Sequence, residues 1–165
     1  MKSLTRDELA RLLDAAEQVS HTDALLIRVI FNHGLRISEA LALTDADIVG
    51  GHLIVKRLKG SKRTTQPLLA DEQELTSLRG RFFNICRRTF DRRMKTYGTK
   101  AGISIIKLHA HVLRHTTGRL SYLGGMGVAE IQSYLGHVSG GNTMIYIQSS
   151  EEEACSAFAA AVGKK

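Results

Sequence analysis

The chain has 165 residues, and its 23 Lys and Arg against 16 Asp and Glu give a formal net charge of +7 at pH 7. With 43% hydrophobic and 24% charged residues, it has the composition of a globular protein with a buried core, which excludes an intrinsically disordered chain. The sequence has no apolar run near the roughly 18 residues of a membrane span and no signal-peptide core at its start, and its two cysteines predict a reducing cytoplasmic setting without disulfides.

The first quarter of the chain predicts helices. Thr5-Arg6-Asp7-Glu8 has the form of a capping box, in which the threonine and glutamate side chains each accept the other's backbone N–H group. Apolar residues then recur at helical spacing as far as Gly34, a residue type that commonly ends helices. We expect three helices here: one from the capping box through residue 16, one from Thr22 or Asp23 to His33, and a short one over Glu39–Leu43 capped by Ser38.

A small antiparallel sheet is predicted next. Residues 53–58 and 64–69 read as short strands on either side of a turn at Gly60-Ser61, and residues 47–49 add a possible third strand. Pro67 has no backbone N–H group to donate, so the strand over 64–69 should lie at an edge of the sheet.

Helices return in the second half. Apolar spacing predicts helices at residues 71–79, 81–97, 112–123 and 129–135, and a capping box at Ser150 begins a last one. The expected fold class is therefore mainly α (α+β), a helical domain with a two- to three-stranded antiparallel sheet.

One of these helices has unbalanced charges. A single acidic residue, Asp91, accompanies five cations, namely Arg87, Arg88, Arg92, Arg93 and Lys95. A charge run of this kind is often no more than a solvated face. The imbalance and the basic net charge favour a surface for nucleic-acid phosphates.

The histidines allow three interpretations. Four of the seven lie between residues 109 and 137. His109, His111 and His115 could suggest zinc, but no cysteine lies near them, and His109 and His111 would not share a helix face. Single histidines are most often core or capping residues. The third interpretation is a phosphodiester site, because His111 and Arg114 are three residues apart and would share one helix face.

Further residues would complete such a site. Tyr146 carries a phenol, which becomes a nucleophile when cations neutralise a phosphodiester and a base takes the phenolic proton. The fork of an arginine fits two phosphate oxygens. Arg36, Lys59 and His137 each follow or occupy a turn signal, and could approach the same phosphate.

The sequence resembles the tyrosine recombinase (phage integrase) family over nearly its whole length. Four motifs carry this resemblance in the family's order: His33-Gly34-Leu35-Arg36-Ile37-Ser38-Glu39-Ala40-Leu41, then Arg57-Leu58-Lys59-Gly60-Ser61-Lys62, then His111-Val112-Leu113-Arg114-His115-Thr116, and finally Leu135-Gly136-His137 with Tyr146 nine residues later.

The resemblance implies a role for each motif residue. Arg36, Arg114 and His137 hold the scissile phosphate, and Glu39 braces the site. Tyr146 forms a 3′-phosphotyrosyl bond, Lys59 protonates the departing 5′-oxygen, and His111 assists as acid or base. No metal or other cofactor is required. The residues expected to bind DNA are Lys62, Arg63, Arg87, Arg88, Arg92, Arg93 and Lys95.

The sequence departs from the family in places. Residues 116–120 and 140–145 differ from the usual motifs, which affects packing and loop flexibility and leaves the reacting groups in place. Members of the family usually carry an N-terminal helical DNA-clamping domain before the segment that begins here at Leu4-Thr5, and we expect this chain to be without it. We therefore expect residues 1–165 to be one catalytic domain, either isolated or from a short recombinase similar to the fimbrial invertases.

The function expected from this resemblance is site-specific DNA recombination by integration, excision or inversion, as on a mobile genetic element. The alternatives are type IB topoisomerase-like relaxation and a non-catalytic DNA-binding relative. The expected partners are double-stranded DNA and, on that DNA, three further copies in a tetramer; accessory DNA-bending proteins are a further class of partner. The expected location is a prokaryotic cytoplasm, at the nucleoid, with no membrane partner.

Overall fold

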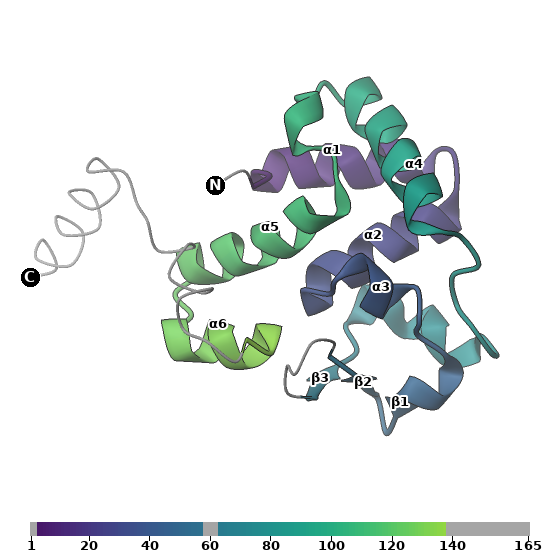
Figure 1. Ribbon diagram of the computed structural model, residues 1–165, viewed down its shortest axis with the longest axis vertical. Coiled ribbons are helices and arrows are strands. Elements are labelled where there is room, and N and C mark those ends of the chain that lie inside the picture. Colours follow the sequence, from purple (N-terminus) through teal and green to yellow (C-terminus); the bar gives the residue numbers. More distant parts are fainter. Residues whose placement is uncertain (1–2, 58–62, 138–165) are drawn as a thin grey trace, which may run out of the picture.

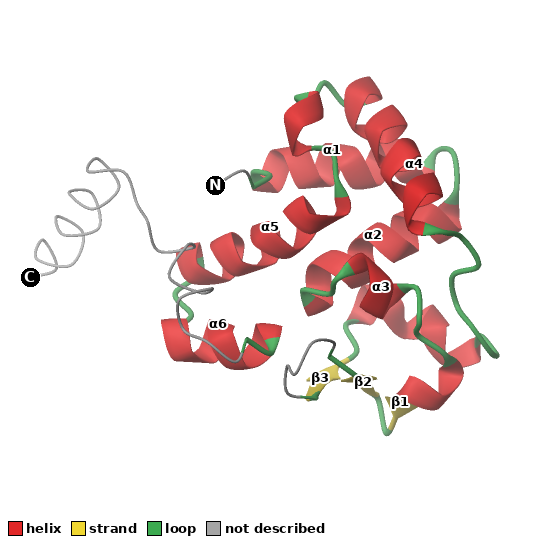
Figure 2. Cartoon of the chain, viewed as in Figure 1, coloured by secondary structure: helices red, strands yellow, loops and turns green. Residues whose placement is uncertain are grey.

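The computed structural model describes residues 3–57 and 63–137, and these residues form a mainly helical domain with one three-stranded antiparallel sheet (Figures 1 and 2). The predicted fold class is confirmed. The elements are α1 (Arg6–Glu17), α2 (His21–His33), α3 (Ile37–Ala40), η1 (Asp45–Asp47), β1 (Ile48–Val49), β2 (His52–Val55), β3 (Thr64–Pro67), η2 (Ala70–Ser77), α4 (Arg87–Lys100), η3 (Ile105–Lys107), α5 (Ala110–Leu123) and α6 (Val128–Leu135).

The first two helices begin and end at the signals read from the sequence. The backbone N–H of Glu8 donates to Thr5 Oγ1 at 3.1 Å, and that of Thr5 donates to the Glu8 carboxylate at 2.8 Å, which confirms the capping box. Helix α2 starts one or two residues early, after Ser20 as its N-cap, and ends at Gly34 in the left-handed conformation. The chain then turns sharply into the segment that holds Arg36.

The short helix α3 corrects one prediction. It begins at Ile37 rather than Glu39, and Arg36, not Ser38, is its N-cap residue. The reason is that the Glu39 carboxylate accepts the backbone N–H of Arg36 at 2.9 Å and so satisfies the first free donor of the helix. This contact already places Arg36 and Glu39 together.

The sheet has the order β1-β2-β3, with β2 in the centre. Residues 52–55 of β2 pair with residues 67–64 of β3, so Pro67 lies on an edge strand as predicted. Leu53 and Val55 point into the core. The sheet lies at the opposite end of the molecule from α4 (Figure 1).

Two predicted helices differ in the structure. The segment 70–77 is a 3₁₀ helix, because its two inward side chains, Glu72 and Leu75, are three residues apart and match three residues per turn. Helix α4 begins at Arg87 instead of residue 81. Arg81 instead forms an isolated antiparallel bridge with Thr44, and the N–H of Phe82 donates to the carbonyl of Leu43 at 3.1 Å, so a tertiary contact overrides the helical periodicity.

The main core lies between α1, α2, α4, α5 and the inner side of the sheet. Helices α5 and α6 agree with their predicted ranges to within two residues. Helix α6 contributes Ile131 and Leu135 to a second, small apolar cluster, and it contacts α5 and β3. Over the described ranges no helix has the length and apolar character needed to cross a membrane.

Candidate active site

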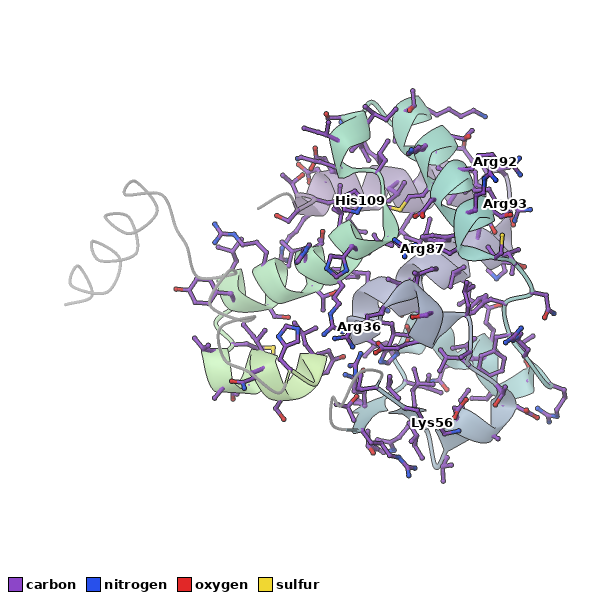
Figure 3. The ribbon with its side chains drawn as sticks, viewed as in Figure 1. Arg36, Lys56, Arg87, Arg92, Arg93 and His109 are labelled. Carbon is purple, nitrogen blue, oxygen red and sulfur yellow. The ribbon has the colours of Figure 1, made fainter. Side chains whose placement is uncertain are left out.

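Arg36, held by the buried Glu39, is the exposed part of the arginine cluster in the candidate site. Arg36 Nη1 donates to Glu39 Oε1 at 2.7 Å, and the arginine side chain keeps 27% of its surface exposed while Glu39 is buried. The turn at Gly34 ends α2 and directs the chain so that Arg36 faces solvent beside α5 (Figure 3). Arg36 is therefore placed to meet a ligand that arrives from solution.

Arg114, on α5, approaches the same Glu39 carboxylate and is only 2% exposed. Its guanidinium donates to the carbonyl of Gly34 and to the carbonyl of Leu135, the latter at 2.9 Å, and lies 3.9 Å from Glu39 Oε2. These carbonyls belong to the C-terminal ends of α2 and α6, where backbone acceptors lack helical partners and the helix dipole favours cations. Arg114 thus joins two helix ends at the site.

A third arginine, which the sequence reasoning did not assign to the site, completes this cluster. Arg57 follows β2, and its side chain is fully buried. It donates to Glu39 Oε2 at 3.1 Å, to the carbonyls of His33 and Gly34 at 3.1 and 3.3 Å, and to the carbonyl of Tyr134 at 2.9 Å. Through these carbonyls Arg57 contacts the same two helix ends that Arg114 joins.

A sequence signal for this role exists. Leu53, Val55 and Arg57 alternate along one side of the strand, so Arg57 continues the inward-facing series of two core residues. An arginine at such a position needs buried acceptors. Period-two reading of the strand would have placed it inside the domain.

The charge of the cluster suits a phosphate. Three guanidinium groups surround one carboxylate, Glu39, which leaves two positive charges in a partly buried place. The phosphodiester group has one negative charge and gains more in a five-coordinate transition state. Fixed cations in a poorly solvated site stabilise such developing charge strongly.

His111, His115 and His137 adjoin this cluster and respond to its charge. Burial, followed by the charges of Arg114 and Arg36, lowers the pKa of His137 to about 4. Burial and then the neighbouring His111 and Arg114 lower the pKa of His115 to about 4. The rings of His111 and His115 pack edge to face, with their centroids 4.5 Å apart. Burial, again with Arg114, lowers the pKa of His111. All three imidazoles are therefore neutral at pH 7, and His111 can accept a proton.

We expect the free energy of unfolding to fall as pH decreases from about 6.5 toward 4. His115 and His137 have folded-state pKa values near 4, below the ordinary histidine value of 6.5, so the unfolded chain binds more protons in this window and is stabilised there. Urea unfolding at several pH values measures this slope. His115→Gln should make it shallower.

His21 serves as a control, because its pKa is shifted in the opposite direction. Hydrogen bonds from His21 to Glu17 and Glu74 raise the pKa of His21, so its stabilising effect is present at low pH and lost as pH rises. Because that contribution is already complete below about pH 6.5, His21→Gln should leave the slope below pH 6.5 nearly unchanged and should remove a loss of stability that occurs above pH 6.5. If His115→Gln left the slope unchanged, the cationic cluster would not act on that imidazole.

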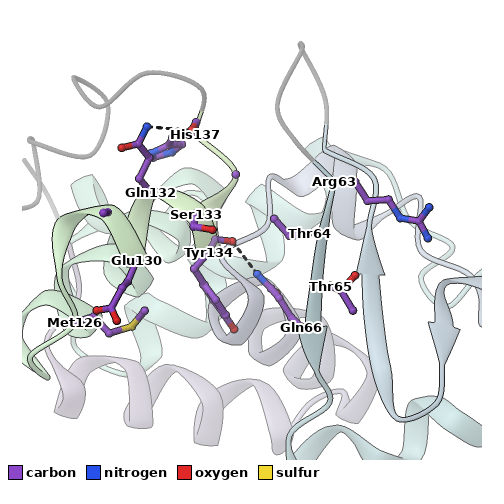
Figure 4. Close-up of a pocket in the computed structure, with 12 residues that line it drawn as sticks. Arg63, Thr64, Thr65, Gln66, Met126, Glu130, Gln132, Ser133, Tyr134 and His137 are labelled. Carbon is purple, nitrogen blue, oxygen red and sulfur yellow. Dashed lines mark hydrogen bonds between the residues drawn. The ribbon is translucent and has the colours of Figure 1, made fainter.

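A pocket of about 800 Å³ opens beside His137 between α6 and β3 (Figure 4). Gln66 on β3 and Tyr134 on α6 both line it, and Gln66 Nε2 donates to the Tyr134 carbonyl at 2.8 Å. Arg63, one of the residues expected to bind DNA, stands at its outer edge on the hairpin. The pocket therefore lies between His137, a candidate site residue, and the hairpin.

The basic face of α4 is partly as predicted. Arg87, Arg88, Arg92 and Lys95 are exposed and line a shallow hollow together with Thr89 and Asp91. Arg87 lies near Arg36 in Figure 3, and the charges of both act on His111. Arg93 differs, because it donates to the buried carboxylate of Asp23 at 2.9 Å and so joins α4 to α2.

The remaining predicted residues divide into two groups. His33 is buried between Gln66 and Glu72, whereas His21, His52 and His109 are exposed, in agreement with structural or surface roles. Lys59, Lys62 and Tyr146 lie outside the described residues. In the two described ranges no three His, Cys, Asp or Glu side chains are grouped so that they could hold a metal ion.

One partly exposed arginine and two buried ones share a carboxylate, with neutral histidines beside them, and this arrangement has the charge and the donors to bind a phosphodiester. The chain belongs to the phage integrase family, whose model matches residues 2–153. This membership agrees with the four motifs from which the resemblance was drawn.

Curated relatives differ in how much of their length the chain covers. Tyrosine recombinase XerA of Pyrococcus furiosus is 32% identical over 164 residues, which is 88% of this chain and 56% of XerA. The type 1 fimbriae regulatory protein FimB of Escherichia coli K12 is 31% identical over 168 residues, 88% of this chain and 84% of FimB. The chain thus spans just over half of the XerA length.

Solved structures confirm the fold. The catalytic domain of bacteriophage HP1 integrase superimposes with a TM-score of 0.73 at 27% identity, over 94% of each chain. The XerH site-specific recombinase bound to its difH substrate, a pre-cleavage complex, gives a TM-score of 0.78 at 23% identity over 95% of this chain and 53% of XerH. At that identity, the XerH likeness is evidence of fold alone.

Proposed function

We propose that this chain is the catalytic domain of a site-specific recombinase that cleaves and rejoins DNA strands through a 3′-phosphotyrosyl intermediate. The observation that carries the proposal is the convergence of three distant motifs: Arg36 and Arg114 meet at the carboxylate of Glu39, and His137 lies close enough for the charges of both arginines to lower its pKa. Family membership and the named recombinases among the relatives support it.

The reaction is a transesterification at phosphorus. The Tyr146 oxygen bonds to the scissile phosphorus, and the bond from phosphorus to the 5′-oxygen breaks. Neutral His111 takes the phenolic proton, and Lys59 donates a proton to the departing 5′-oxygen. The new phosphotyrosyl bond keeps the energy of the broken phosphodiester, so rejoining needs no further energy source and no cofactor.

Each cation has its own task in this scheme. Arg36 meets the non-bridging oxygens first, because part of its side chain is exposed, and its fork matches two oxygens. Arg114 adds charge from a buried position, where solvent screens it little. His137 is neutral in the free domain, and an arriving phosphate anion would raise its pKa and favour a proton that can bond to the phosphate.

The substrate we propose is double-stranded DNA in a prokaryotic cell. XerH is described as bound to difH, and lambda integrase as a dimer bound to a core site. Four copies on two duplexes would allow paired exchange of strands, with DNA-bending proteins as further partners. The exposed cations of α4 supply the sequence-independent part of DNA binding.

We expect DNA affinity to fall steeply with salt, and an Arg87→Ala, Arg92→Ala double variant to weaken binding to every sequence alike. If each arginine contacts one phosphate, the slope of log affinity against log salt should become shallower by about 2. Fluorescence anisotropy with a labelled duplex measures it. Arg11 and Arg79, exposed arginines on α1 and after η2, give a charge-matched control pair. Equal effects of the two pairs would refute a dedicated phosphate-binding face.

The deciding experiment is capture of the covalent intermediate. The chain is incubated with a nicked duplex from which the short cleaved fragment diffuses away, so that the phosphotyrosyl adduct accumulates and can be seen on a denaturing gel. Tyr146→Phe removes a single oxygen and should abolish the adduct. A parent chain that binds the duplex and yields no adduct would identify a non-catalytic DNA-binding relative. Adduct formation on every sequence, with relaxation of supercoiled plasmid, would identify a topoisomerase.

A further inference from the structure

We propose that Arg57 is a positioning residue that holds the hairpin bearing Lys59 against the carbonyls at the ends of α2 and α6. This inference deepens the proposed function and rests on it. Lys59 would deliver the proton to the leaving group, and Arg57 would set where that lysine stands.

The two helix ends form a surface that we call the site floor, defined by the carbonyls of His33 and Gly34 on α2 and of Tyr134 and Leu135 on α6. Both helices end at a glycine in the left-handed conformation, Gly34 and Gly136. Their last carbonyls have no partners within the helices and carry the negative end of each helix dipole. Buried donors with positive charge are needed there, and arginine supplies them.

Two arginines span the site floor from different elements. Arg114 comes from α5 and joins Gly34 to Leu135. Arg57 comes from the hairpin and joins His33 and Gly34 to Tyr134. Loss of Arg57 would leave the two helix ends joined by Arg114. Leu53 and Val55 would still hold β2 in the core, but the chain beyond Val55 would lose its hydrogen bonds to the site floor.

The second arm of the hairpin is held at the same point. Gln66 Nε2 donates to the Tyr134 carbonyl at 2.8 Å (Figure 4), the carbonyl that also accepts from Arg57. Gln66 Oε1 lies 2.8 Å from Nδ1 of the buried His33. Arg57 Nε further donates to Thr64 Oγ1 at 3.2 Å, from one arm to the other. The base of the hairpin is thus hydrogen-bonded to the site floor by one side chain from each arm.

The position of Arg57 restricts that of Lys59, because the two residues are close together in the chain. Lys59 is two residues after Arg57 in sequence, and two residues extend over at most about 7 Å. The elements that hold Arg36, Arg114 and His137 keep other contacts with the core. A change at Arg57 should therefore displace the general acid more than the phosphate-binding groups.

The test compares two DNA substrates, one with the natural 5′-oxygen at the scissile bond and one with sulfur in its place. Sulfur leaves without protonation, so it makes the general acid unnecessary. Arg57→Lys keeps the charge beside Glu39 but loses the fork that reaches three carbonyls. We expect adduct formation on the oxygen substrate to fall on the order of 100-fold, and sulfur to restore most of that loss, as it should for Lys59→Ala.

A destabilised variant of the same strand separates positioning from stability. Leu53 is fully buried on β2 and makes no contact of this polar kind, so Leu53→Val lowers the melting temperature without touching the site floor. Leu53→Val should reduce adduct formation equally on the oxygen and the sulfur substrate. Should Arg57→Lys fail to fold, Gln66→Met removes the contact of the other arm and should show the same preference for sulfur.

The outcomes distinguish this inference from the proposed function. If the parent chain forms no adduct on either substrate, the proposed function itself fails. If the parent cleaves both substrates and sulfur rescues Lys59→Ala but neither Arg57→Lys nor Gln66→Met, Arg57 supports the fold alone and the inference is wrong. Rescue of all three variants, with Leu53→Val unrescued, establishes it.

Discussion

An Arg114→Lys variant should bind its duplex with nearly the parent affinity and form the covalent adduct more slowly by a factor of about 10² to 10³, the cost of losing one transition-state donor group. Lysine retains the charge but not the paired N–H groups that reach the Gly34 and Leu135 carbonyls. The cation would then stand off the phosphate, and the two helix ends would lose a link. Single-turnover adduct formation measures the rate, and anisotropy measures the affinity.

The sulfur substrate separates this defect from loss of the general acid. Sulfur changes the need for a proton and does not change the charge on the non-bridging oxygens, so Arg114→Lys should stay slow on it. Arg28→Lys is the matched control, because Arg28 is a partly buried arginine that pairs with Asp71 away from the site. Rescue of Arg114→Lys by sulfur would contradict the assigned role.

Gly34→Ala should destabilise the fold by about 2–4 kcal/mol, from left-handed strain and overpacking together. Gly34 has φ +57°, and a Cβ atom there would stand 2.2 Å from Leu135 Cδ2 on α6. The clash would push α6 away from α2, and with it the turn that carries His137. Adduct formation should fall as well, because Gly34 also supplies a carbonyl to Arg57 and Arg114.

A second glycine isolates the contact from the strain. Gly50 has the same φ of +57° and nothing within 4 Å of a Cβ atom. Gly50→Ala therefore has the left-handed penalty alone, and the difference between the two variants in urea unfolding measures the clash with α6. Equal destabilisation by both would show that α6 yields freely to the added methyl group.

Local chemistry explains which expectations were confirmed. Thr5 and Glu8 satisfy each other within one turn, Gly34 ends a helix by its own conformational freedom, and Pro67 is excluded from a central strand by its missing donor. None of these depends on distant residues. The helices with such signals were therefore found within one or two residues.

Long-range contacts explain the errors. Residues 81–86 have a helical apolar spacing, yet the backbone N–H of Phe82 donates to the distant carbonyl of Leu43, and the helix begins only at Arg87. Arg93 follows the same logic, since a cation on a basic face became the partner of buried Asp23. A pattern of neighbours in sequence contains no information about a partner 40 or 70 residues away.

The sequence by itself determined the fold class and the family and supplied the candidates for the reactive side chains, because short motifs carry them: Arg36 with Glu39, His111 with Arg114, and Gly136 with His137. Only the tertiary structure decided that Arg57 belongs with them. Its partners are backbone carbonyls at the ends of two helices. Every residue has such a carbonyl, so the residue types do not show which of them will accept a hydrogen bond from Arg57. Where buried charge must be matched by backbone acceptors, only the packing of the elements shows which residue meets them.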